Sequence, residues 1–88
     1  MKTILFYWSK GSDTRRRIIR VIAECEKKSG ACYLSVIADR LRLSHVAVKK
    51  HLDLLVEEGY VEILNPEGKP VFLALTSKGK EILREISS

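Results

Sequence analysis

Apolar residues recur along the chain with two different spacings. From residue 14 to residue 58 they return every three or four positions, which is the spacing of one buried face of an α-helix. Beyond residue 60, short runs rich in β-branched and aromatic residues replace that spacing, and such runs are typical of strands. The pattern therefore predicts three helices, a β-hairpin and a last helix, with an apolar segment in front.

The first helix is expected from about Thr14 to Lys28, with Ser12 or Asp13 as its N-terminal cap. Gly30 suits the left-handed conformation that ends many helices. The apolar positions of this helix share one face: Ile18, Val21, Ile22 and Cys25.

Two further helices are expected close together. After a short extended piece, Ala31–Leu34, Ser35 is the predicted cap of a helix that reaches Leu41. Ser44 then predicts the start of a third helix, from His45 to about Glu58. Gly59 ends this third helix. The inner positions of the two helices are Ile37, Ala38 and Leu41, then Val48, Leu52, Leu55 and Val56.

The last third of the chain predicts a hairpin and a helix. Tyr60–Leu64 and Val71–Leu75 are the two strands, and the Asn-Pro-Glu-Gly between them suits a type I turn with Asn first and Gly fourth. Thr76 is the predicted cap of a helix from Ser77 to about Ile86, whose inner residues are Ile82, Leu83 and Ile86.

Length and charge narrow the class of protein. A chain of 88 residues forms one small domain with a limited core, which leaves little room for a deep active-site pocket. Sixteen Lys and Arg against eleven Asp and Glu give a net charge of +5 and a pI near 9.4, which favours a polyanionic partner. The chain has no Gln and one Asn among many Lys, Arg and Glu, a usage that favours a thermophilic source.

Membrane, secretion, metal and enzyme classes find little support in the residues. The longest apolar run, Ile4–Trp8, is far shorter than the roughly 20 residues of a membrane span, and the absence of a secretory pattern makes a cytoplasmic protein the expectation. Cys25 and Cys32 are read as small buried hydrophobes, with a redox bridge as the alternative. His45 and His51 are about 600° of helical rotation apart, so they face different sides and predict no metal site. Neither a catalytic motif nor a cofactor motif is present.

Several motifs in fixed order resemble the winged helix-turn-helix domain. Two helices joined by a turn of three or four residues are followed by a two-stranded hairpin, and the match covers Leu34 to Glu85. The Leu-Thr-x-x-Gly after the hairpin resembles the same feature in many MarR-like, ArsR-like and PadR-like regulators. The residues that carry the resemblance are Ile37-Ala38, Leu41, Leu43-Ser44, Val48, His51-Leu52, Leu54-Leu55, Glu58–Val61 and Leu75–Gly79.

The resemblance implies an α+β, mostly helical fold: a three-helix core, a two-stranded wing and a C-terminal helix. Residues 14–88 would form this domain and residues 1–13 an N-terminal arm or extra strand. The sequence departs from the family at Arg42, where the turn between the helices usually has Gly. A positive φ at Arg42 would cost roughly 1 kcal/mol.

The resemblance also implies a function, namely sequence-specific binding of double-stranded DNA by a transcriptional regulator. The helix after Ser44 would enter the major groove, and the hairpin tip would flank the backbone. The predicted DNA-binding residues are Arg40, Arg42, Ser44, His45, Val46, Lys49, Lys50 and Lys69. Lys49 and Lys50 precede Glu57 and Glu58 along this helix, the reverse of what the helix dipole favours, so their placement indicates a ligand.

Other interpretations of the same residues stay open. In the first alternative, the charged residues of the third helix form only a solvent-exposed face, and Lys69 is an ordinary lysine of a solvated loop. Arg15, Arg16, Arg17 and Arg20 are expected at the surface, with backbone contacts to DNA as the lesser alternative. In a second alternative, the whole domain is a protein-interaction module of transcription or replication machinery. In a third, it is an RNA-binding domain.

The apolar N-terminal segment and the last helix are the two candidates for contact with another subunit. The segment up to Trp8 holds half of the six aromatic residues, so it either packs on its own domain or reaches a second chain. Ile82, Leu83 and Ile86 form the other candidate face. A homodimer is the expected assembly.

Overall fold

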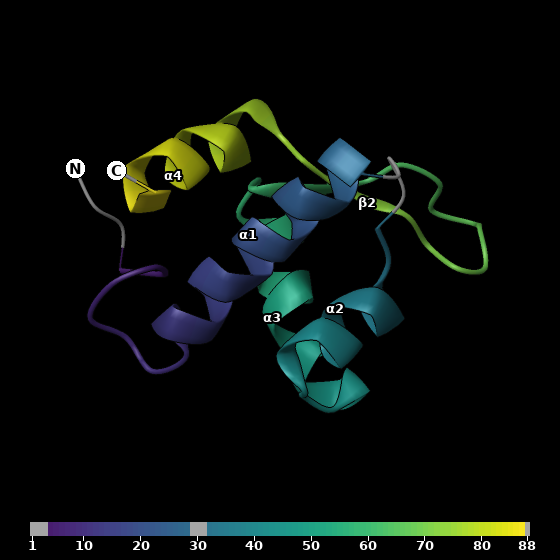
Figure 1. Cartoon of the computed structure of the whole chain (residues 1–88), viewed down its shortest axis with the longest axis horizontal. Helices are drawn as coiled ribbons and strands as arrows, with labels where there is room; N and C mark the ends of the chain where they lie inside the picture. The colour runs from purple at the N-terminus through teal and green to yellow at the C-terminus, as the bar shows by residue number, and fades with distance from the viewer. Residues whose placement is uncertain (1–3, 29–31, 88) are drawn as a thin grey trace.

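The computed structural model describes residues 4–28 and 32–87 and has the predicted order of elements (Figure 1). Within these residues, four helices and one two-stranded antiparallel sheet follow one another. Their bounds are α1 Ser12–Lys28, α2 Leu34–Leu41, α3 His45–Glu57, β1 Val61–Ile63, β2 Leu73–Leu75 and α4 Ser77–Ser87. The predicted succession of three helices, a hairpin and a helix is confirmed, and the fold is the winged helix-turn-helix.

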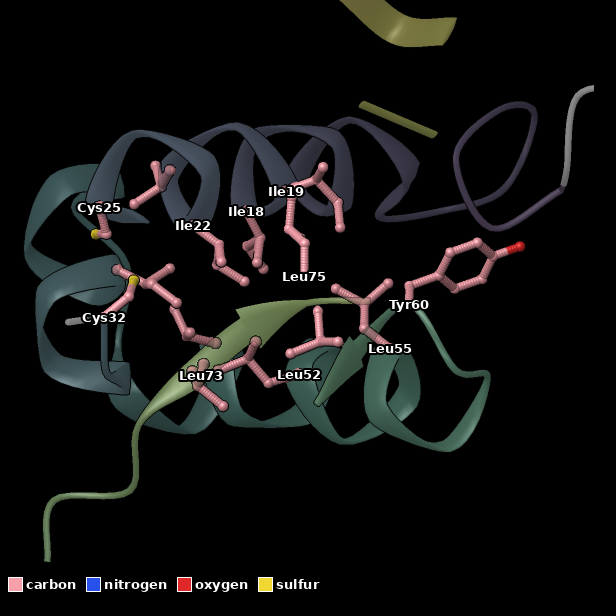
Figure 2. Packing of buried hydrophobic residues seen from close by; sticks show 14 of the residues in the cluster. Ile18, Ile19, Ile22, Cys25, Cys32, Leu52, Leu55, Tyr60, Leu73 and Leu75 are labelled. Atoms are coloured by element: carbon pink, nitrogen blue, oxygen red, sulfur yellow. The ribbon is translucent and has the colours of Figure 1, made fainter. Parts of the chain in front are cut away.

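The core lies between α1 on one side and α3 and the hairpin on the other (Figure 2). Helix α1 also contacts α2 and α4, so it is the central element of the fold. Ile18, Ile19 and Ile22 of α1 have no exposed surface, and the same holds for Val48 and Leu55 of α3. Fully burying one such side chain contributes about 1.5–3 kcal/mol, so this wall of contacts dominates the stability.

Helix α1 begins two residues earlier than predicted. The carbonyl of Gly11 accepts from the backbone N–H of Arg15 at 3.0 Å, so Ser12 and Asp13 lie inside the first turn and the prediction of either as the cap is wrong. Gly11 has φ 84°, and a Cβ on it would lie 2.7 Å from Cε1 of His51. The positive φ favours glycine at this position, and any side chain here would require the His51 ring to move.

Helix α2 also begins earlier, at Leu34, and the prediction of Ser35 as its cap is wrong. Tyr33 occupies the N-cap position in an extended conformation without a side-chain cap. The chain is held extended up to this point because the carbonyl of Cys32 accepts from Leu73 at 2.7 Å and the Tyr33 ring packs on Phe72. The predicted Gly30 cap and the Ala31 end of the extended piece lie outside the described residues.

The turn between α2 and α3 follows the prediction. Arg42 adopts the left-handed conformation with φ 56°, a strain of roughly 1 kcal/mol for a residue other than glycine. The Ser44 hydroxyl accepts from Ala47 N at 3.1 Å, which confirms the cap of α3. Gly59, with φ 85°, follows the helix end as expected.

The hairpin is confirmed, but each strand is three residues long rather than five. Val61 pairs with Leu75 and Ile63 with Leu73. The turn has the predicted form, with Gly68 N donating to the Asn65 carbonyl at 2.8 Å. The Asn65 side chain also accepts from the backbone N–H of Phe72 at 2.6 Å, so a side chain takes over where the sheet was expected to continue.

The start of α4 is fixed by two small groups. The Thr76 hydroxyl accepts from Gly79 N at 3.0 Å, which confirms Thr76 as the cap. A Cβ on Gly79 would lie 2.1 Å from the Tyr60 carbonyl, so the helix can approach the hairpin only with glycine at this position. The Gly of the Leu-Thr-x-x-Gly motif thus has a packing role.

Cys25 and Cys32 are free, buried thiols in the core. Burial raises the pKa of Cys32 above its ordinary value, and a hydrogen bond with Cys25 raises it further. A thiol with a raised pKa is a poor nucleophile, so Cys32 acts as a small hydrophobe. Cys25 is buried in the same core and packs there as a small side chain.

Residues 4–11 form a succession of turns that folds back onto the domain. Phe6 has no exposed surface, and its ring meets that of Tyr60 edge-on with centroids 5.0 Å apart. Ile4 and Trp8, in contrast, are 68% and 80% exposed. One aromatic of this segment therefore belongs to the core, while its neighbours face outward.

Replacing Phe6 by Ala is expected to lower the free energy of unfolding by about 3–5 kcal/mol, because it leaves a cavity in a packed core. The control Ile4→Ala removes an exposed side chain of the same segment and should change stability by no more than about 0.5 kcal/mol. Urea unfolding followed by circular dichroism measures both. Equal, small effects of the two substitutions would show that the segment is not part of the core.

Candidate nucleic-acid interface

The outer face of α3 gathers four of the predicted residues. Val48 and Leu52 point into the core, so the helical period turns His45, Val46, Lys49 and Lys50 towards solvent. Val46 is 80% exposed although it is an apolar residue on a helix whose other large aliphatic side chains are buried or half-buried. An exposed apolar side chain between cations is a surface suited to a ligand with both charge and apolar groups.

The two lysines of this face lie on different flanks of α3. Lys49 Nζ donates to Asp53 Oδ2 at 2.9 Å, and both line a cavity of about 230 Å³ shared with Ile63 and Val71 of the hairpin region. Lys50 instead lines a cavity on the side of the N-terminal turns. Lys49 is thus partly neutralised beside the wing, whereas none of the ion pairs among the described residues involves Lys50.

Arg15 is buried, with 5% of its surface exposed, and the expectation of surface exposure for this residue is wrong. Its guanidinium donates to the Leu5 carbonyl at 2.6 Å, to Ser9 Oγ at 2.7 Å and to the Lys10 carbonyl at 3.1 Å. Burial lowers the pKa of Arg15 from its ordinary value. The sequence contained the signal, because Arg15 precedes Ile18, Ile19 and Ile22 by three, four and seven residues and so shares their face.

His51 connects α3 to this buried arginine. Its Nδ1 lies 3.3 Å from Nη1 of Arg15. Burial lowers the pKa of His51, and the charges of Arg15 and Lys50 lower it further. Three positively charged or chargeable groups are therefore held together at this flank of α3, which the separate motifs in the sequence did not indicate.

The other predicted site residues are spread around α3. Arg42 is exposed in the turn before α3 and Ser44 is its cap, so both stand at the N-terminal end of the helix. Arg40 is exposed but forms an ion pair with Glu24, which holds its guanidinium beside α1. Lys69 is exposed on the hairpin tip, which extends away from the helices (Figure 1).

The described part of the chain contains neither a group of metal-ligating residues nor a helix that could span a membrane. No group of three His, Cys, Asp or Glu residues within it is arranged to hold a metal ion. His45 is exposed while His51 contacts Arg15, so the two lie on different sides of α3 as expected. None of the described helices is both long and apolar enough to cross a membrane.

Comparison with known sequences gives one informative relative and no matching family model. The chain is 34% identical over 68 residues to an uncharacterized HTH-type transcriptional regulator, B-115, of Sulfolobus spindle-shape virus 1. The match covers 77% of this chain and 55% of the relative, so the chain spans about half of the viral protein's length.

Solved structures share the arrangement of helices and hairpin. A variant of ZitR from Lactococcus lactis superposes with a TM-score of 0.72 at 24% identity, over 86% of this chain and 50% of ZitR. AF1382 from Archaeoglobus fulgidus superposes with the same TM-score at 21% identity, over 98% of this chain and 90% of AF1382. At these identities the likeness shows a common fold.

The lowered pKa of His51 makes stability depend on pH. His51 binds a proton more readily in the unfolded chain than in the folded one. The free energy of unfolding is therefore highest above about pH 6.5, and it decreases as the pH falls from there towards the folded-state pKa of His51. His51→Gln should flatten this part of the curve of melting temperature against pH between 7.5 and 5. His45→Gln, which removes an exposed histidine, is the control and should keep the wild-type curve. Superimposable curves for all three proteins would contradict the assigned His51 environment.

Proposed function

We propose that this chain, a winged helix-turn-helix domain, binds double-stranded DNA in a sequence-specific manner as part of a transcriptional regulator. The outer face of α3 carries the proposal: it combines exposed cations, a histidine and an exposed valine on one rigid helix whose opposite side is locked into the core. The similarity to a viral HTH-type transcriptional regulator supports the same function.

The dimensions of α3 fit the major groove. Its 13 residues make a helix about 20 Å long, and the groove, about 12 Å wide, admits an α-helix. His45 and Val46 are in the first turn, where recognition helices of this kind meet base edges. His45 supplies hydrogen-bonding nitrogens, and Val46 supplies an apolar contact of the kind that thymine methyl groups accept.

The charges along α3 support a ligand at its N-terminal half. Lys49 and Lys50 precede the acidic Glu57 and Glu58, although the helix dipole favours the opposite order by a few tenths of a kcal/mol per charge. The ion pair of Lys49 with Asp53 is exposed and therefore weak, so a DNA phosphate can replace Asp53 as the partner of Lys49. Lys50 has no such ion pair among the described residues, so it can bind a phosphate without first leaving a carboxylate.

The residues outside α3 are assigned to the DNA backbone. Arg42 and Ser44 stand at the N-terminal end of α3, and Lys69 stands at the tip of the wing. Arg40 takes part only by leaving its ion pair with Glu24. About four to five phosphate contacts are then made by each subunit, which corresponds to a slope near −4 in a plot of log affinity against log salt.

A homodimer is the proposed assembly, with the exposed part of the N-terminal turns as the contact surface. Ile4 and Trp8 are large apolar residues left mostly exposed. On α4, by contrast, Ile82 is buried and Leu83 and Ile86 already pack against the core. The apolar surface available for a second copy is therefore greater at the N-terminal turns than on α4.

DNA binding is tested with random-sequence duplex DNA across a salt series. Lys49→Ala/Lys50→Ala should flatten the log–log slope by about two units, because two phosphate contacts are lost. Lys27→Ala/Lys80→Ala is the matched control, since it removes two lysines from the groove between α1 and α4 and should leave the slope unchanged. Weak wild-type binding, or equal slopes for both double variants, would favour a protein partner instead.

The assembly is tested by sedimentation velocity over a concentration series. The wild type is expected at twice its 10.0 kDa chain mass, and Trp8→Ser should shift the equilibrium towards the monomer. Arg84→Glu alters an exposed residue of α4 and should have no such effect. A dimer that Arg84→Glu dissociates and Trp8→Ser leaves intact would place the contact on α4, and a wild-type monomer would end the dimer proposal.

A further inference from the structure

A cavity of about 480 Å³ lies between the N-terminal turns and α3. The first turn of α1 and the middle of α3 form its walls. The residues that line it are Lys10, Gly11, Arg15, Lys50, His51 and Leu54. It adjoins the outer face of α3 and joins that helix to the N-terminal turns, which lie outside the helix-turn-helix motif.

The charges of this cavity are unbalanced. Lys10, Arg15 and Lys50 are cations, and none of the lining residues is acidic. The ion pairs within the described residues join Arg16 to Asp13, Arg40 to Glu24 and Lys49 to Asp53, so they leave all three of these cations without a carboxylate. Three like charges around one hollow repel one another, and an anion placed in the hollow would relieve that repulsion.

Arg15 gives the cavity a fixed positive wall. It is 95% buried, and within the described residues its guanidinium contacts backbone carbonyls, the Ser9 hydroxyl and His51. These groups satisfy its hydrogen bonds but supply no negative charge, and a buried charge without a counter-charge is costly. Burial lowers the pKa of the neighbouring His51, and the charges of Arg15 and Lys50 lower it further.

The chemistry of the cavity wall favours a phosphate group. Gly11 has no side chain to occupy the space beside the His51 ring, which a Cβ would approach to 2.7 Å from Cε1. The N-terminal end of α1, a helix of 17 residues, adjoins Gly11 and adds the positive end of its dipole. Lysine is a point-charge binder of phosphate, and here Lys10 and Lys50 approach from two different segments.

We propose that this cavity binds a phosphate group, and that in the complex with DNA it holds one backbone phosphate beside α3. The second part rests on the proposed function. Lys50 connects the two surfaces, since it belongs both to the outer face of α3 and to the cavity. A phosphate held there fixes the position of the duplex relative to α3 by contacts that carry no sequence information.

The contact is tested with Lys10→Ala, because Lys10 is exposed and lies outside α3. Its loss should reduce the log–log salt slope by about one unit and weaken binding to the same extent for every DNA sequence, as expected for one phosphate contact. Lys80→Ala, which removes an exposed lysine from α4, is the matched control and should bind like the wild type. Circular dichroism checks that both variants fold.

Neutral methylphosphonate linkages, placed one at a time along a bound duplex, locate the phosphate. The wild type should lose affinity at one position where Lys10→Ala is insensitive, while both proteins respond equally at every other position. A second experiment titrates inorganic phosphate into the free protein and follows the Gly11 amide and the His51 ring by NMR. Saturable shifts that Lys10→Ala abolishes would show that free phosphate also enters.

The outcomes separate this proposal from the proposed function. If the duplex binds but Lys10→Ala behaves like Lys80→Ala at every linkage, and inorganic phosphate causes no NMR shifts, the cavity is not a phosphate site. The proposed DNA binding would then remain intact. Phosphate shifts without an effect of Lys10→Ala on DNA would confirm a phosphate site and assign it to free phosphate. A wild type that binds no duplex but shows the shifts would remove the DNA function and keep the site.

Discussion

The buried face of α1 is the constraint on which the rest of this structure depends. Ile18, Ile19 and Ile22 form a wall of the core that α3 shares through Val48, Leu52 and Leu55, and the same helix contacts α2, β2 and α4. Because the inner side of α3 is fixed by this wall, its outer side is fixed as well. The exposure of Val46 and the cations around it is thus a consequence of burial elsewhere.

One end of that wall is polar, because the buried guanidinium of Arg15 lies there. Arg15 continues the apolar face of α1 but carries a charge into it, and the surrounding turns supply carbonyls and a hydroxyl to satisfy the guanidinium. The same arginine lies beside His51 of α3. A group that orders the N-terminal turns therefore also places positive potential beneath one flank of the outer face.

The two flanks of α3 consequently differ in their electrostatics. On the side of the wing, Lys49 is paired with Asp53 and the neighbouring cavity is largely apolar. On the side of the N-terminal turns, Lys50 joins Lys10 and Arg15 without a carboxylate among the lining residues. An approaching polyanion would experience the stronger attraction on this second flank, so α3 is a surface with a preferred side.

The sequence by itself determined the order of elements, the caps at Ser44 and Thr76, the Asn65 turn and the inner positions of α3. These features depend on local periodicity or on a side chain that bonds its own neighbouring backbone, and both are visible in a short window. Only the tertiary structure decided the start of α2, which follows the pairing of Cys32 with Leu73, and the burial of Phe6 against Tyr60. It also decided the partners of Arg15 and Arg40. Whether either of them faces a carbonyl, a carboxylate or solvent depends on residues up to 36 positions away, and no local pattern encodes such a meeting. The pairing of Lys49 with Asp53, one helical turn away, is local by comparison.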